Sequence, residues 1–130
     1  MFNKGDKIWT EGPWGTQHYG IVMGYVVGYG LCVIHNNKGT GVEWTTFDAF
    51  SNGRPVSLEW AAPDDPYVQE EIVQRALSLL GRRYDLILFN CEDLANYAQT
   101  GFAYSPQLLL LGLVAVGAGA LLYRALKARA

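Results

Sequence analysis

The chain has 130 residues, which is enough for one domain, and half of these residues are hydrophobic. Residues 1–106 contain all 12 acidic groups and seven of the ten basic groups. This acidic body lacks the basic surface that neutralises phosphates, so the composition argues against a nucleic-acid partner. The two cysteines are too few for a disulfide scaffold.

Strand-like segments fill the first sixty residues. Tyr19–Val27 and Leu31–His35 are rich in Val, Ile and Tyr, and Gly28-Tyr29-Gly30 lies between them, which predicts a β-hairpin. Asn36–Gly41 is predicted to be a second turn and Glu11–Gly15 a loop. The remaining strands are predicted at Lys7–Thr10, Val42–Phe47 and Val56–Trp60.

The hydrophobic period becomes helical after these strands. Asp65 is a candidate N-cap, Pro66 suits the first helical position, and Gly81 ends the apolar pattern, so residues 66–80 are predicted to form a helix. Strands followed by helices indicate an α+β fold, in which an antiparallel β-sheet packs against helices.

A second helix is predicted to begin at Asn90 and to end at Gly101. Asn90 is a good N-cap, and Asp93 can reach back towards it as an acidic form of the capping box. Cys91 then occupies the first turn, where the helix dipole and free backbone N–H groups favour a thiolate and can hold an oxyanion. The alternative interpretation is a buried cysteine on the apolar face of this helix.

The other cysteine and the two histidines have different surroundings. Cys32 lies in an apolar run and is interpreted as a buried small hydrophobic residue. His18 begins the first hairpin strand and His35 ends the second, so the open end of the hairpin is predicted to bring them together. A Cys–His pair oriented by a third polar group is what an activated thiol requires. Alternatively, both histidines are ordinary surface or core residues.

A zinc site built from the two histidines and one cysteine is the competing chemistry. The chain has no close pair such as CxxC or HxxxH, and such spacings mark most zinc sites. The sequence therefore predicts neither a metal nor a cofactor.

The C-terminal segment is the most apolar part of the chain. Residues 108–123 carry no charge, and extension to Leu126 gives a helix of roughly 28 Å, close to the ~30 Å hydrocarbon core. We therefore predict an enzyme domain at residues 1–105 and a single-pass membrane anchor helix with a basic tail at 106–130. A buried core helix is the alternative. The small residues that could pack against another helix are Gly112, Ala115 and Gly119.

The side of the membrane on which the body lies is predicted from the two ends of the sequence. No secretory signal is visible, and a span close to the C-terminus is typical of a tail anchor, so the body is expected to be cytoplasmic and in a reducing compartment. Arg124, Lys127 and Arg129 instead favour a cytoplasmic C-terminus.

An ordered set of motifs matches a known family. The motifs are Gly5-Asp6-Lys7-Ile8, Gln17-His18-Tyr19-Gly20-Ile21-Val22, Val33-Ile34-His35, Asn90-Cys91-Glu92 and the C-terminal apolar segment. In these the chain resembles the lecithin–retinol acyltransferase-like family, the circularly permuted branch of the NlpC-type papain-like thiol enzymes. It is also similar to the H-box and NC-motif proteins found in some viruses. The resemblance implies a permuted papain-like, NlpC-type fold.

The resemblance also implies a chemistry for the candidate residues. Cys91 matches the family's nucleophile, His18 its general base and His35 its second, orienting polar residue. Family enzymes take an acyl chain from a phosphatidylcholine-type lipid and pass it to water, an amine or an alcohol. The implied partners are therefore a phospholipid bilayer, a lipid acyl donor and an acyl acceptor. The chain departs from the common animal pattern at Asp93, where those enzymes carry a histidine, and in a longer His18–His35 connection.

Two other functions compete with lipid acyl transfer. One is a thiol amidase or peptidase, because the wider superfamily cleaves peptide-like bonds. The other is a non-enzymatic membrane protein that keeps only the fold. The apolar tail favours lipids over peptides, and the presence of His18, His35 and Cys91 together favours an enzyme.

Overall fold

The computed structural model describes residues 1–85 and 90–101. Five strands form one antiparallel sheet in the order β4-β3-β2-β1-β5, with helices packed against it, as the α+β prediction requires. The strands are β1 (Lys7–Glu11), β2 (Gln17–Val26), β3 (Gly30–Asn37), β4 (Gly41–Thr46) and β5 (Val56–Trp60). The helical segments are η1 (Pro13–Gly15), α1 (Phe47–Ser51), α2 (Pro66–Leu77) and α3 (Cys91–Thr100).

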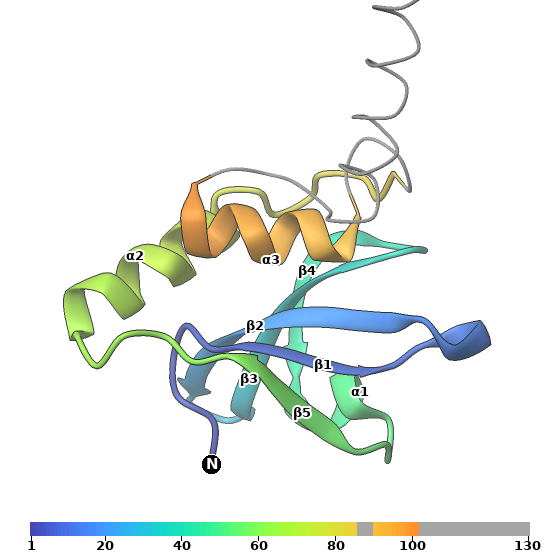
Figure 1. Ribbon diagram of the computed structural model, residues 1–130, viewed down its shortest axis with the longest axis horizontal. Helices are drawn as coiled ribbons and strands as arrows, with labels where there is room; N and C mark the ends of the chain where they lie inside the picture. The colour runs from blue at the N-terminus through green and yellow to red at the C-terminus, as the bar shows by residue number, and fades with distance from the viewer. Residues whose placement is uncertain (86–89, 102–130) are drawn as a thin grey trace, which may run out of the picture.

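The two faces of the sheet carry different helices. On one face, α2 and α3 lie side by side (Figure 1), and Leu94 of α3 packs with Ile21 and Ile34 of the sheet. On the other face, Phe50 of α1 packs against Val22 and its neighbours. Side chains alternate between faces along a strand, which is why Ile21 and Val22 belong to different clusters.

Helix α3 begins and ends as the sequence predicts. The Asn90 side chain accepts hydrogen bonds from the backbone N–H groups of Glu92 and Asp93, and the Asp93 carboxylate accepts one from the Asn90 N–H at 3.0 Å. Gly101, with φ of 82°, ends the helix in the left-handed conformation. This reciprocal cap makes Cys91 the first residue of α3.

The prediction that the preceding helix extends to residue 80 is wrong, since α2 ends at Leu77. The chain beyond it is held beside β4: the Gly81 N–H donates to the Val42 carbonyl, and the Val42 N–H donates to the Arg82 carbonyl. Between α2 and these bonds the backbone forms turns, in which the Leu79 N–H donates to the Ala76 carbonyl and the Leu80 N–H to the Leu77 carbonyl. Helix α1, which follows β4, was not predicted; the Thr46 side chain caps it by accepting the Ala49 N–H.

Within residues 1–85 and 90–101, no helix is long and apolar enough to cross a bilayer. The predicted anchor at 106–130 lies outside the described residues.

Gly41 provides a test of the packing between β4 and residues 81–83. Its φ is +78°, and an added Cβ would lie 2.3 Å from the Arg82 carbonyl oxygen. We expect Gly41→Ala to lower the free energy of unfolding by about 2 kcal/mol or more, through backbone strain and steric overlap together. Urea denaturation measures this.

Gly39 is the matched control because it lies in the same turn, where an added Cβ meets no atom within 4 Å. Gly39→Ala should change the unfolding free energy by no more than about 0.5 kcal/mol. Equal losses in the two variants would contradict the packing seen at Gly41.

Candidate active site

The two histidines are in direct contact, as the hairpin predicts. The Nε2 atom of His18 lies 2.7 Å from the Nδ1 atom of His35. The register pairs Gly20 of β2 with His35 of β3, so His18 reaches its partner diagonally from two residues earlier in β2. His35 is buried, with 6% of its surface exposed.

Glu43 extends this contact and was not singled out in the sequence. It lies opposite His35 in the β3–β4 pairing, and its Oε1 atom lies 2.9 Å from the His35 Nε2 atom. An available signal was the turn at Asn36–Gly41: an antiparallel strand after that turn places the start of β4 beside the end of β3. His18, His35 and Glu43 thus form one hydrogen-bonded chain across three adjacent strands.

Phe50 shields the histidine pair from solvent. The centre of its ring lies 5.3 Å from that of His18 and 5.8 Å from that of His35. Burial, with a smaller effect of the His35 charge, lowers the pKa of His18 to about 4. Burial also lowers the pKa of His35, although Glu43 opposes that shift. Both rings are therefore neutral at pH 7, and a neutral imidazole can accept a proton.

Cys91 lies at the start of α3, against the first residues of β2. Its Sγ atom donates to the Gln17 carbonyl oxygen at 3.8 Å. Burial raises the pKa of the thiol, and the charge of Glu92 raises it further. Hydrogen bonds from backbone N–H groups, that of Tyr19 above all, lower the same pKa but do not outweigh burial. The thiol is therefore protonated at pH 7 and needs a base before it can attack.

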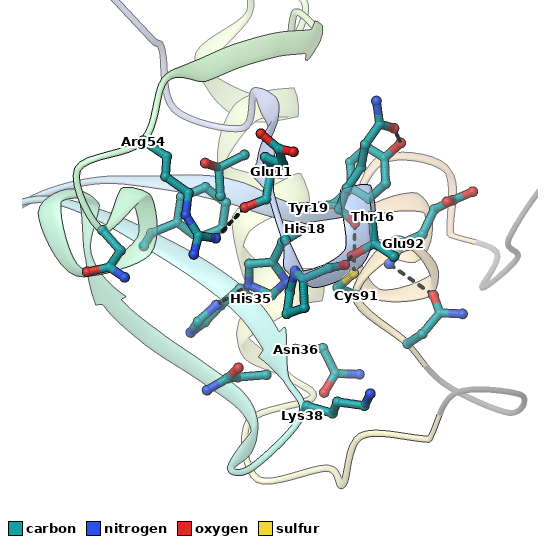
Figure 2. Close-up of a pocket in the computed structure, with 18 of the residues that line it drawn as sticks. Glu11, Thr16, His18, Tyr19, His35, Asn36, Lys38, Arg54, Cys91 and Glu92 are labelled. Carbon is teal, nitrogen blue, oxygen red and sulfur yellow. Dashed lines mark hydrogen bonds between the residues drawn. The ribbon is translucent and has the colours of Figure 1, made fainter.

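One groove, with a volume of about 850 Å³, contains all three predicted site residues. Figure 2 shows the His18 ring lying between His35 and Cys91. The two cations that line the groove, Lys38 and Arg54, lie on different sides of these residues (Figure 2). The thiol and both histidines therefore line the same groove.

The rim of the groove includes the loop between β1 and β2. Trp14 in η1 lines the groove and is 100% exposed, and its φ of 61° is in the left-handed region that non-glycine residues rarely adopt. The loop therefore holds a large aromatic side chain out in solvent beside the site. From the sequence, this segment was predicted only to be a loop.

Cys32 lies in the interior of β3 and is completely buried, as predicted. Cys91 is partly exposed, so it is the more accessible of the two thiols. Among residues 1–85 and 90–101, no group of three or more His, Cys, Asp or Glu side chains could hold a metal ion.

The low pKa of His18 predicts an unusual pH dependence. The folded-state pKa, about 4, lies below the ordinary histidine value near 6.5. The neutral ring therefore persists as the pH falls through 6.5 and is lost only towards pH 4. We expect the acid limb of kcat/KM for any reaction in which His18 acts as the base to have its midpoint nearer 4 than 6.5. Circular dichroism over the same range separates this limb from acid unfolding, and a midpoint at 6.5 in folded protein would contradict the expectation.

A thiol at a helix start and two neutral histidines that share its groove are the parts that nucleophilic acyl chemistry requires. The family model described as lecithin retinol acyltransferase matches residues 1–104, and the chain belongs to this family. Members of the family are acyltransferases and phospholipases. A search of curated proteins gave no match.

Proposed function

We propose that this protein is a thiol acyltransferase or phospholipase A-type hydrolase that takes an acyl chain from a phospholipid onto Cys91. The observation that carries the proposal is the shared groove, which Cys91, His18 and His35 all line and in which His18 is hydrogen-bonded to His35. Family membership supports acyl chemistry, and the raised pKa of the Cys91 thiol supports a mechanism that needs a base.

The first half of the reaction forms a thioester. His18 takes the Cys91 proton, the sulfur attacks the ester carbonyl carbon, and the carbonyl oxygen becomes an oxyanion. The Cys91 backbone N–H at the start of α3 is suited to hold that oxyanion, whereas the Glu92 and Asp93 N–H groups are bonded to the Asn90 side chain. The carbon–oxygen bond of the ester then breaks, and the leaving lysophospholipid oxygen takes the proton from the His18 imidazolium.

The second half returns the enzyme to its resting state. Water, an amine or an alcohol attacks the thioester carbon while His18 removes a proton from the attacking atom. The carbon–sulfur bond breaks, and the sulfur recovers a proton from His18. The identity of the attacking group decides whether the reaction is hydrolysis or acyl transfer.

Two features support a lipid substrate. Trp14 is fully exposed on the rim of the groove, and tryptophan favours the interface between headgroups and acyl chains. The apolar residues of the proposed anchor at 106–130 would hold the domain at a bilayer, with the enzyme domain proposed to face the cytoplasm.

The experiment that tests this function is intact-mass spectrometry after incubation with phosphatidylcholine vesicles. We expect one acyl adduct, which peptide mapping locates at Cys91 and which disappears on treatment with hydroxylamine. A peptide or isopeptide substrate is incubated in parallel. Cleavage of that substrate without any acyl adduct from lipid would replace the lipid assignment by an amidase function.

The proposed anchor has its own test. Burial of about sixteen apolar residues at even ~0.5 kcal/mol each amounts to several kcal/mol. We therefore expect the full chain to float with liposomes and a chain ending at Ser105 to remain in the dense fraction. The shorter chain should keep activity on dispersed short-chain lipid but lose most of its activity on liposomes. Unchanged liposome activity would show that residues 106–130 are not the route to substrate.

A further inference from the structure

Glu43 belongs to the same hydrogen-bonded chain as the proposed base His18. It is not one of the described residues that line the groove. Its side chain is 37% exposed, whereas that of His35 is only 8% exposed. The carboxylate therefore connects a buried histidine to the edge of the protein. An exposed carboxylate contributes little to stability through a surface contact alone. Here, however, the partner of Glu43 is His35, which contacts the proposed base His18 directly.

The donors and acceptors of this chain can be assigned from Glu43 outward. An ionised carboxylate only accepts hydrogen bonds, so the Nε2 atom of His35 carries the proton in the 2.9 Å contact. In a neutral imidazole the other nitrogen is then a bare acceptor, so His35 Nδ1 accepts from His18 Nε2 across 2.7 Å. His18 Nδ1 is consequently left without a proton.

The reverse arrangement would disable the base. If His35 Nδ1 carried the proton, it would donate the hydrogen bond and His18 Nε2 would accept that bond. The neutral His18 ring would then have to carry its own proton on Nδ1. No nitrogen of His18 would then be free to take the Cys91 proton. Glu43 blocks this arrangement, because it leaves no donor opposite His35 Nε2.

Glu43 also offsets part of the free-energy cost of a positive charge on the buried histidines. Phe50 packs against both histidines, so little water can stabilise a proton that arrives on His18. The Glu43 carboxylate favours positive charge on His35, and this makes His35 Nδ1 a stronger acceptor for the hydrogen bond from His18. The imidazolium formed when Cys91 is deprotonated is stabilised in the same way.

We propose that Glu43 is a positioning residue that sets the tautomers of both histidines, so that His18 presents a bare Nδ1 to the Cys91 thiol. This proposal rests on the proposed function for its kinetic consequence, but the tautomers themselves do not depend on any activity.

The test compares Glu43→Gln, Glu43→Asp and the control Glu71→Gln. A glutamine amide can donate to His35 Nε2 and so permits the reverse arrangement, whereas aspartate keeps a carboxylate. Glu71 also has a side-chain partner, Arg75 at 3.1 Å, but it lies on α2 with its side chain 63% exposed. The control therefore removes the same charge from an exposed carboxylate that does not contact the histidines.

Two readouts are taken on the full chain, after circular dichroism has shown that each variant is folded. Because the chain has only two histidines, nitrogen-15 NMR of the imidazole rings resolves four nitrogens and reports both tautomers directly. We expect protons on both Nε2 atoms in the wild type, and a protonated His18 Nδ1 in Glu43→Gln. For turnover, kcat should fall roughly 10- to 100-fold in Glu43→Gln with KM within a few-fold, and Glu43→Asp should recover part of the loss.

The two readouts separate the two proposals. Tautomers that follow Glu43 in a protein with no acyl turnover would support the positioning role and reject the function. Normal wild-type turnover, with unchanged tautomers and kcat in Glu43→Gln, would overturn the positioning role and leave the function standing. An equal loss of kcat in Glu71→Gln would also overturn it, by showing that net charge alone is responsible.

Discussion

Replacement of Cys91 by alanine is expected to abolish both the acyl adduct and turnover of acyl esters. The thiol at the start of α3 is the only proposed nucleophile in the groove, and alanine leaves no atom that can form a thioester. The fold should survive, because the cap that defines the helix start is made by Asn90 and Asp93. Intact-mass spectrometry and steady-state turnover measure the two losses.

Cys32→Ala is the matched control for that experiment. Its sulfur is completely buried in β3 and donates only weakly, to the Gly30 carbonyl at 3.5 Å. The substitution should cost some stability through the small cavity it leaves, while turnover stays within roughly a few-fold of wild type. An adduct that persists in Cys91→Ala but vanishes in Cys32→Ala would reverse the assignment.

Replacement of His18 by alanine is expected to reduce the rate of acyl-enzyme formation by about 10²–10⁴-fold, the usual range for a lost general base. The raised pKa of Cys91 makes the loss large, because the protonated thiol has no other proposed acceptor in the groove. Single-turnover measurements of thioester formation give the rate directly. Raising the pH should restore part of it, since hydroxide can replace the missing base.

His35→Gln is the comparison for that loss. A glutamine can still accept a hydrogen bond from His18 Nε2, so the base keeps a partner and the rate should fall less than in His18→Ala. A His18→Ala variant that forms the thioester at the wild-type rate would remove His18 from the mechanism.

The antiparallel hairpin and the helix starts could be predicted because local chemistry determines them. The hairpin is predicted by the Gly28–Gly30 turn between two β-branched runs, and α3 by the Asn90–Asp93 cap. The contact between His18 and His35 follows from the hairpin, since the two ends of a hairpin must meet. The predicted start of α2 at Pro66 also agrees with the structure.

Features that depend on contacts between distant segments could not be predicted in the same way. Beyond Leu77 the backbone forms turns and then pairs with Val42, which is distant in sequence, and no local pattern reveals that pairing. Helix α1 has only five residues, too few to establish a helical period. The contact of Glu43 with His35 depends on the register of β3 against β4, and a single glutamate in a predicted strand does not by itself indicate such a contact.

The order in which the site can assemble follows from the sequence distances between its contacts. His18 meets His35 across 17 positions and His35 meets Glu43 across eight, so successive hairpins can build the histidine chain early. Cys91 meets the Gln17 carbonyl across 74 positions, and closing so long a loop costs more entropy. A ribosome also makes α3 after the whole sheet. A partly folded chain would therefore carry the proposed base without the proposed nucleophile in reach, so acyl loading would count only molecules whose folding is complete.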